Sequence, residues 1–460
     1  MAASNVQPAR GTRDFLPADV RRREHVIRVV REVYERYGYE PLETPAFENI
    51  ETLLGKYGEE GNRLIFKILR RGEHEASGET DLALRYDLTV PLARVIAQYQ
   101  NELPRFFKRY QIQPVWRADR PARGRFREFF QCDIDAIGST STVVEAEQIA
   151  AVGDVLAALG FTDFTILVNH RRILTGLLDA GGVPPAQHEA ALVALDKFDK
   201  IGERGVVAEF LSRGIDERAA SRIIGMLRDI QGIPSNGPSG AALANGERIE
   251  MLRACLGESP HRSAVENLSE ILGLVSKHPV ARHLSVNPRL ARGLSYYTGA
   301  IMEIAVEGIG SLGGGGRYDN LIGMFLGREV PACGFSLGLE RIIVVMTERG
   351  MFPATAESGV VDAVVTFMDE ESKAEALGLA SELRACGLKV DVYPEPSRKF
   401  DKALKYATGR GARVMGIFGE NERQKAETGV RNLLTREQTS VKRSETAAFI
   451  VRLLNPTSST

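Results

Sequence analysis

Residues 109–136 carry the pattern that most restricts how this chain can fold. YQIQPVWR and RFREFFQCDIDA each have the composition of a strand, and the turn-rich ADRPARG lies between them. This arrangement predicts two antiparallel strands joined by a long hairpin loop. An antiparallel sheet is therefore expected in the first part of the chain.

The second strand of the pair should have two different faces, because side chains alternate with a period of two along an extended chain. One face would be apolar, with Glu128 as the exception: Phe126, Phe130, Cys132 and Ile134. The other face would be polar: Arg125, Arg127, Phe129, Gln131, Asp133 and Asp135. A solvated sheet face also reads polar, so this strand alone fits either a surface or a ligand site.

The end of the first strand favours the ligand site. Arg117 follows Val115 and Trp116 just before the loop. Guanidinium groups bind phosphate through two hydrogen bonds, and an aromatic ring can stack on a purine. Arg117, Arg125 and Arg127 around Phe129 would therefore suit a nucleotide.

Helices and strands alternate irregularly up to about residue 350. An amphipathic helix is predicted over 18–37, ended by Gly38, with its apolar face formed by Val26, Val29, Val30, Val33 and Tyr37. A helix over 142–159 and a strand over 164–170 follow. Residues 184–276 are rich in Ala, Glu and Arg and read as an inserted helical module, broken at 232–240. Strand-like, glycine-rich segments resume over 284–340.

Beyond about residue 350 the pattern changes again. VVDAVVTFM, a helix over 371–386, LKVDVYPE, a helix over 398–408 and ARVMGIFG alternate as strand and helix, which predicts a small, mostly parallel α/β domain after a linker at 351–359. The expected domains are 1–183 and 277–350 for the two parts of the sheet domain, 184–276 for the helical insertion, and 361–456 for the α/β domain.

Composition limits the functional classes. At 460 residues the chain is too long for one core, and 43% of its residues are apolar, as in a soluble protein. No run approaches the roughly 18 apolar residues of a membrane helix, and the start lacks the apolar segment of a secretion signal. We expect a cytoplasmic protein without a membrane partner. The net charge of −1 means that nucleic acid would have to bind at local patches.

Cysteine and histidine usage argues against several chemistries. The four cysteines, Cys132, Cys255, Cys333 and Cys386, form no CxxC pair and are expected to be buried thiols. The seven histidines include no HExxH and no helical pair four apart. Neither a zinc site nor a nucleophilic triad is indicated.

Three further segments carry candidate site residues. In LRYDLTVPLAR, Arg85, Asp87 and Thr89 would share a face if extended, and a carboxylate there could hold an ammonium group, although surface strands often carry such residues. In CGFSLGLERI, Glu340 and Arg341 follow two glycines. The glycines could simply allow close packing, or the segment could be a buried element that places Arg341 in a site. GGGGRYD resembles a phosphate loop, but it lacks GK[ST] and the Rossmann pattern, so both readings are rejected.

Two stretches raise the question of what they bind. Lys399, Lys402 and Lys405, with aromatic Phe400 and Tyr406, form a basic stripe that is either a solvated helix face or an RNA contact. RGLSYYTG places Tyr296 and Tyr297 side by side, and both can reach one ligand only if the backbone is irregular over 292–298. A regular strand should then begin after Gly299.

Taken together, these segments resemble the class II histidyl-tRNA synthetase family over nearly the whole chain. GTRDFLP with ETPAFE is similar to the first class II motif, WRADRPARGRFREFFQCDIDAIG to the second and GFSLGLERI to the third. LARGLSYYTG, GGGRYD and LRYDLTVP resemble the family's histidine-binding segments. The resemblance implies an α+β catalytic domain with an antiparallel sheet flanked by helices, a helical insertion and a C-terminal α/β anticodon-binding domain.

The resemblance also implies an activity. It is the ATP-dependent ligation of L-histidine to the 3′ end of tRNA(His) through a histidyl-adenylate, with Mg²⁺ bound to the ATP phosphates and the protein acting as a homodimer. Arg292 and Arg117 would be catalytic. The histidine site would comprise Asp87, Leu88, Thr89, Arg117, Gln131, Asp135, Arg292, Tyr296 and Tyr297. ATP would contact Arg117, Asp119, Arg125, Phe129 and Arg341, and tRNA would contact Arg120, Lys399, Lys402 and Lys405.

One position departs from the family, and two other functions remain open. Many members carry Asp where this chain has Ser295. A regulatory paralogue that binds histidine without catalysis would keep the fold, and typically loses the arginines or the anticodon domain. A pure RNA-binding protein would explain the basic stripe but not the polar strand face.

Overall fold

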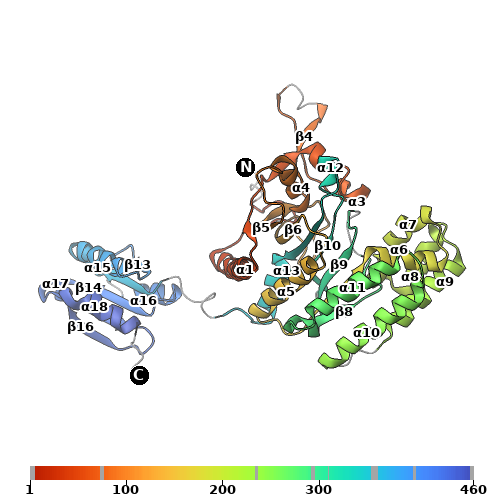
Figure 1. The fold of residues 1–460 in the computed structure, drawn as a ribbon. Coiled ribbons are helices and arrows are strands. Elements are labelled where there is room, and N and C mark those ends of the chain that lie inside the picture. The colour runs from red at the N-terminus through yellow and green to blue at the C-terminus, as the bar shows by residue number, and fades with distance from the viewer. Residues whose placement is uncertain are drawn as a thin grey trace. The chain divides into compact units, whose positions relative to one another are not determined.

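The computed structural model describes residues 6–72, 77–233, 237–291, 296–308, 310–353, 361–396 and 400–455. The chain forms two compact units, Met1–Phe352 and Pro353–Thr460. Each unit is built around its own sheet (Figure 1). No helix among these residues is both long enough and apolar enough to cross a membrane.

The first unit is organised by an eight-stranded sheet in the order β1-β5-β6-β11-β10-β9-β7-β8. The predicted hairpin is confirmed as its antiparallel pair β5 and β6, and only the edge pairs β1–β5 and β7–β8 are parallel. The strands predicted over 164–170 and 284–340 are also confirmed. The strands are β1 (Glu40–Pro41), β5 (Phe107–Trp116), β6 (Glu128–Ile137), β7 (Phe164–His170), β8 (Leu284–Val286), β9 (Ala300–Val306), β10 (Gly310–Arg317) and β11 (Ala332–Gly338).

Helices α1 (Pro17–Arg36), α5 (Val143–Ala158) and α13 (Leu339–Glu348) cover one face of this sheet. The Tyr110 hydroxyl of β5 donates to Glu35 of α1 at 2.8 Å, so the face that carries Tyr110 and Ile134 is the helix-covered one. The predicted apolar stripe of α1 is buried, except that Tyr37 is half-exposed and donates to Asp154 instead. The polar residues of β5 and β6 must therefore lie on the other face.

The hairpin differs from the prediction at its loop end. Strand β6 begins at Glu128, so Arg125 and Arg127 do not continue its polar face. Arg125 forms a bridge with Ala122 across a tight turn instead. The turn residues of ADRPARG therefore extend the loop further than alternation suggested, and the polar face begins at Phe129.

The segment 84–94 is also different, because it is not a strand. Strand β4 ends at Leu84 and α4 begins at Thr89. Asp87 accepts a hydrogen bond from the backbone N–H of Val90 at 3.0 Å, as helix-capping side chains do, and Pro91 fits a first helical turn. The extended conformation considered for Arg85, Asp87 and Thr89 is therefore wrong. The surrounding elements are β2 (Phe47–Asn49), α2 (Ile50–Leu53), α3 (Gly58–Arg63), β3 (Lys67–Leu69), β4 (Thr80–Leu84), α4 (Thr89–Gln98) and α12 (Gly323–Leu326), with β2, β4 and β3 forming a small sheet.

Residues 171–283 are helical apart from the short connections between helices (Figure 1). Their predicted break at 232–240 is shorter in the structure, because α10 already begins at Gly237. The helices are α6 (Arg171–Gly181), η2 (Pro185–Gln187), α7 (His188–Leu195), α8 (Phe198–Ser212), α9 (Glu217–Gln231), α10 (Gly237–Leu256), α11 (Arg262–Val275) and η3 (Pro279–His283).

The second unit has a five-stranded sheet in the order β13-β12-β14-β15-β16. The predicted alternation is confirmed for β13, β12 and β14, which are parallel. "Mostly parallel" is wrong, because β15 and β16 add an antiparallel hairpin whose outer strand, QTSVK, is polar and exposed. The elements are β12 (Ala363–Phe367), η4 (Glu370–Ser372), α15 (Lys373–Ala385), β13 (Val390–Val392), α16 (Phe400–Gly409), β14 (Val414–Phe418), α17 (Glu420–Gln424), β15 (Glu427–Asn432), β16 (Gln438–Lys442) and α18 (Arg443–Leu454).

The cysteines are all free, as expected, but they are not all buried. Cys132 and Cys333 lie in the core, Cys255 is half-buried and Cys386 is exposed.

A buried ion pair ties β10 to α5 and gives a stability prediction. The Arg317 guanidinium donates to both Glu145 oxygens, at 2.6 and 2.8 Å, and the two side chains are 8% and 1% exposed. Removing one partner of such a pair leaves an uncompensated charge and costs about 3–5 kcal/mol. We expect Glu145→Ala to lower the free energy of unfolding by this amount, measured by urea denaturation with the fluorescence of Trp116, the one tryptophan, as the probe.

The matched control is Glu147→Ala, two residues along the same helix. Glu147 pairs with Lys108 at 3.0 Å on the surface, and its loss should cost at most about 1 kcal/mol. Equal losses from the two variants would contradict the buried-pair interpretation.

Candidate active site

A small cavity lies on the face of the large sheet that carries the polar residues of β6. The cavity is narrow: its volume is about 20 Å³, which is room for about one water molecule, and it is partly open to solvent. Its lining is Thr89, Asp133, Asp135, Tyr296, Tyr297, Gly314, Tyr318, Gly334, Phe335 and Ser336. A larger hollow beside Leu54, Arg63 and Phe66 is widely open, and its lining contains no carboxylate among the described residues.

Asp87 supplies a carboxylate close to this cavity. It is 2% exposed and accepts from the Tyr57 hydroxyl and the Val90 N–H, both at 3.0 Å and both on Oδ1. Burial raises the pKa of Asp87, against the opposing effects of the Val90 N–H and the Arg117 charge. Oδ2 has no hydrogen-bond partner among the described residues. A buried acceptor left open in this way suits a cationic group of a ligand.

Gln131, Asp133 and Asp135 follow one another on the cavity face of β6, as alternation predicted. The Gln131 amide donates to Ser336 Oγ at 2.7 Å, while its Oε1 has no hydrogen-bond partner within the described part of the chain. Burial raises the pKa of Asp133 to about 7, which the Arg109 charge opposes. Asp135 accepts from the Tyr318 hydroxyl and pairs with Arg109 at 2.7 Å.

The cavity stays open because glycines face these carboxylates. Gly334 of β11 lies opposite Asp135 in the ladder, and a Cβ there would collide with the Asp135 carboxyl group. In β10 a Cβ on Gly316 would lie 3.0 Å from the Tyr297 ring. GGGGRYD is thus a sheet strand whose glycines make space, in keeping with the rejection of a phosphate loop.

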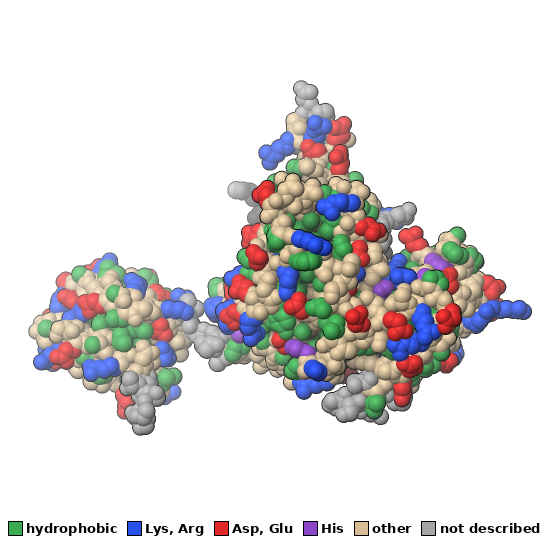
Figure 2. Space-filling model, in the orientation of Figure 1, with side chains coloured by type: hydrophobic (Ala, Val, Ile, Leu, Met, Phe, Trp, Pro, Cys, Tyr) green, Lys and Arg blue, Asp and Glu red, His purple; other side chains and the backbone are tan. Residues whose placement is uncertain are grey.

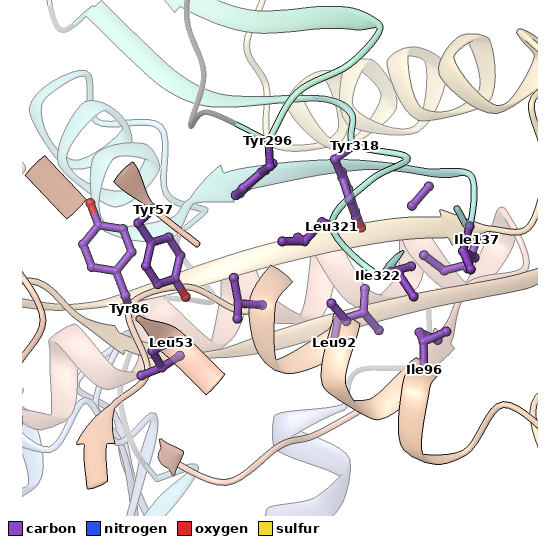
Figure 3. Packing of buried hydrophobic residues seen from close by; sticks show 14 of the residues in the cluster. Leu53, Tyr57, Tyr86, Leu92, Ile96, Ile137, Tyr296, Tyr318, Leu321 and Ile322 are labelled. Carbon is purple, nitrogen blue, oxygen red and sulfur yellow. The ribbon is translucent and has the colours of Figure 1, made fainter. Parts of the chain in front are cut away.

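Tyr296 and Tyr297 both line the cavity although they are adjacent. The described residues 296–299 are irregular and β9 starts at Ala300, which confirms the expected strand start after Gly299. Figure 3 shows Tyr296 and Tyr318 on one side of a buried cluster, with Tyr57 and Tyr86 beside them. Arg292 and Ser295 lie outside the described residues.

Arg117 and Phe129 lie together at the end of the hairpin. The Arg117 Nε donates to the Tyr86 carbonyl at 3.0 Å, and the guanidinium lies 4.3 Å from the Tyr86 ring and 5.2 Å from the Phe129 ring. This half-buried arginine is the member of the predicted arginine group that contacts Phe129. The guanidinium groups of the other two bind Asp119: Arg125 at its carboxylate, 2.8 Å away, and Arg127 at its carbonyl.

The remaining ATP and RNA candidates are spread over the surface. Arg341 donates to the Ser311 carbonyl, which holds its side chain against β10. Arg120 is exposed in the hairpin loop. Lys402 and Lys405 are exposed on α16, whereas Phe400 and Tyr406 are partly buried against the core of the second unit. Lys399 lies outside the described residues.

Basic and acidic side chains are intermixed over the visible face of each unit (Figure 2). This distribution accords with the net charge of −1. Any attraction for an RNA backbone must therefore come from local groups such as the lysines of α16.

Sequence reasoning missed several residues of this cavity. Arg109, Tyr57, Tyr318 and Ser336 all contact the site carboxylates or amide. Arg109 pairs with Asp135 between β5 and β6. It immediately precedes YQIQPVWR, the segment predicted to be the first strand. Extending the period-two count by that residue would have placed it on the polar face.

Comparisons with known proteins agree with this arrangement. The family model for histidyl-tRNA synthetase matches residues 11–342, and the model for the anticodon binding domain matches residues 360–453. A histidine–tRNA ligase from Cytophaga hutchinsonii is 39% identical over 451 residues, which cover 94% of this chain and 96% of that protein.

Two solved structures share the fold. A histidyl-tRNA synthetase from a Nostoc species superposes with a TM-score of 0.78 at 30% identity, covering 98% of this chain and 99% of that one. A Bacillus halodurans protein described as an ATP phosphoribosyltransferase regulatory subunit/histidyl-tRNA synthetase has a TM-score of 0.71 at 20% identity, covering 90% and 98%, and shows the fold alone.

The antiparallel sheet with flanking helices, the helical insertion and the separate α/β unit form the layout of a class II aminoacyl-tRNA synthetase, which confirms the expected fold class. The chain belongs to the histidyl-tRNA synthetase family.

Glu340 joins α13 to β6 and gives a pH prediction. Both of its oxygens accept from the Phe130 N–H, at 3.1 and 3.0 Å, and burial raises its pKa from 4.5 to about 7. A carboxyl whose pKa is raised on folding stabilises the fold at low pH, and this contribution is lost as the pH rises from the unfolded to the folded pKa. Between about pH 4.5 and pH 8 wild type should therefore lose about 3 kcal/mol relative to Glu340→Gln.

The measurement is urea denaturation of both proteins across this range. Glu348→Gln on the same helix is the control: the ion pair with Arg123 lowers the pKa of Glu348, so its contribution is lost only below about pH 4.5 and its difference from wild type should stay nearly constant across this range. Parallel curves for wild type and Glu340→Gln would contradict the assignment.

Proposed function

We propose that this chain is a histidine–tRNA ligase, which joins L-histidine to the 3′ end of tRNA(His) through a histidyl-adenylate and releases AMP and pyrophosphate. The observation that carries the proposal is a group of buried polar side chains: Asp135, Tyr296 and Tyr297 line the cavity, Asp87 and Gln131 lie close to it, and Arg117 and Phe129 lie at the end of the same hairpin. Family membership supplies the reaction, and the cavity supplies groups suited to its amino acid.

In this proposal the amino acid binds by both ends. The α-ammonium group donates to Asp87 Oδ2 and Gln131 Oε1, which have no hydrogen-bond partner among the described residues. Leu88 and Thr89, which follow Asp87 in the chain, complete this part of the site. The imidazole lies among Asp135, Tyr296 and Tyr297. Desolvated imidazole needs one acceptor and one donor, which a carboxylate and a phenol can provide.

ATP is proposed to bind beside this cavity. Its adenine would stack on Phe129, its phosphates would meet Arg117, Arg125 and Arg341, and Asp119 would lie near them. Mg²⁺ would be bound to the ATP phosphates, as the family resemblance implies.

The first step needs no protein nucleophile. The histidine carboxylate attacks the α-phosphorus in line, the bond to pyrophosphate breaks, and Arg117 and Arg292 stabilise the charge on the equatorial oxygens. In the second step a ribose hydroxyl at the tRNA 3′ end attacks the adenylate carbonyl and AMP leaves. Arg120 would contact the acceptor end, and Lys399, Lys402 and Lys405 would contact the RNA from the C-terminal domain.

We further propose the domain roles and the assembly. Residues 1–183 and 277–350 would form the catalytic domain, 184–276 an insertion and 361–456 the anticodon-binding domain. The protein would act as a cytoplasmic homodimer. Retention of Arg117, Arg341 and the second unit favours the enzyme over a regulatory protein that only binds histidine.

Histidine-dependent exchange of labelled pyrophosphate into ATP tests the activity directly. We expect exchange with pure protein, Mg²⁺ and histidine, and histidylation when tRNA(His) is added. A protein that binds histidine without exchanging pyrophosphate would be the regulatory alternative. Pyrophosphate exchange without histidylation of tRNA(His) would mean that the proposed RNA partner is wrong.

A second prediction concerns Arg292. Because this arginine would meet charge that develops only in the transition state, Arg292→Ala should slow single-turnover adenylate formation by about 100-fold or more, with little change in histidine affinity. Arg282→Ala, which removes an exposed arginine, is the control and should keep the wild-type rate. A loss of histidine affinity at an unchanged rate would refute the role of Arg292.

A further inference from the structure

Arg109 is a buried cation beneath the cavity that the proposed reaction leaves without a role. Its side chain is 0% exposed, and it stands opposite Asp135 in the β5–β6 ladder. One guanidinium nitrogen, Nη2, lies 2.7 Å from Asp135 Oδ2 and also donates to the Leu88 carbonyl at 3.2 Å. The other, Nη1, donates to Gln111 at 3.1 Å. One residue thus contacts both the predicted imidazole site and the turn before α4.

The carboxylates explain why a cation is required at this place. Asp87, Asp133 and Asp135 are each 2% exposed and lie close together, and burial raises the pKa of all three. The Arg109 charge opposes this effect at both Asp133 and Asp135. Without it, Asp135 would take up a proton more readily and would present a donor in place of an acceptor.

The contacts of Asp135 favour its carboxylate form, which accepts hydrogen bonds. Arg109 approaches one carboxylate oxygen and the Tyr318 hydroxyl donates to the other. Each oxygen retains a free lone-pair direction, and Gly334 leaves space above it. An N–H of the ligand ring is the group that completes this arrangement.

The Leu88 contact links the same arginine to the opposite end of the ligand. Leu88 lies between Asp87 and Thr89, the residues proposed for the α-ammonium group. A second buried arginine, Arg85, holds the start of this turn by donating to the Pro114 carbonyl and to Gln113 of β5, at 2.9 and 3.0 Å. The turn is therefore fixed to β5 from both sides.

We propose that Arg109 is a positioning residue for histidine: it presents the Asp135 carboxylate as an acceptor to the imidazole N–H and holds the Leu88 carbonyl so that Asp87 and Thr89 face the same cavity. This inference rests on the proposed function. It makes Arg109 specific for the amino acid, because the described contacts of Arg109 do not include Arg117 or Phe129, where the nucleotide is proposed to bind.

The test compares Arg109→Met, Arg109→Lys and Lys108→Met in pyrophosphate exchange, together with calorimetric titration of histidine. Lys108 is the matched control, because it is the neighbouring cation and points to the other face, where it binds Glu147 and the Tyr37 carbonyl. Arg109→Met should raise the KM and the Kd for histidine by about tenfold or more, the loss expected for a hydrogen bond to a charged group. The KM for ATP should change by less than about twofold, a difference too small to reflect a lost contact. Arg109→Lys should recover part of the histidine affinity, and Lys108→Met should behave as wild type.

The double variant Arg109→Met/Asp135→Asn keeps the test informative if Arg109→Met does not fold, because it removes both charges of the pair. It should bind histidine about as weakly as Asp135→Asn alone, since Arg109 acts largely through Asp135. An unchanged histidine KM in Arg109→Met, equal rises in both KM values, or additive losses in the double variant would overturn the inference while leaving the activity in place. Absence of exchange in wild type would instead overturn the proposed function.

Discussion

The burial of three carboxylates on one face of a sheet is the constraint around which the first unit is arranged. Asp87, Asp133 and Asp135 are all but inaccessible to solvent, and an uncompensated buried charge is costly. The compensation comes from segments far apart in the sequence: Arg109 from β5, the Val90 N–H from α4 and the Tyr318 hydroxyl from the segment after β10. Within the described part of the chain Asp87 Oδ2, Gln131 Oε1 and Asp135 Oδ2 have no hydrogen-bond partner, and an amino acid can supply donors to them.

Glycine and tyrosine shape the space above these carboxylates. Gly334 of β11 faces Asp135 and Gly316 of β10 faces Tyr297, and because neither has a side chain the sheet itself forms the floor of the cavity. The backbone before β9 is irregular, which lets two consecutive tyrosines line one cavity. Side chains at the two glycines, or a regular strand before β9, would have filled or divided the cavity.

Much of this could be predicted from the sequence, for identifiable reasons. Alternation along 129–135 placed Gln131, Asp133 and Asp135 on one face, since strand periodicity is a local property. The signals failed where a side-chain contact outside the strand alternation decides the outcome. Asp87 became a helix cap, Arg125 turned to Asp119, and Phe400 and Tyr406 joined a core that their own helix does not reveal. Arg109 was missed because its role exists only through pairing with a strand 26 residues later, in the ladder between β5 and β6.

The carboxylate of Glu340 has a mechanical consequence at the other side of the hairpin. It grips the Phe130 N–H from the first turn of α13, and so it connects the residue before Arg341 to the residue after Phe129. The ring proposed to stack on adenine and the arginine proposed to meet the phosphates are thus connected through a single side chain, that of Glu340. Because the carboxylate links the start of α13 to β6, it limits how far the adenine site and the phosphate site can move apart.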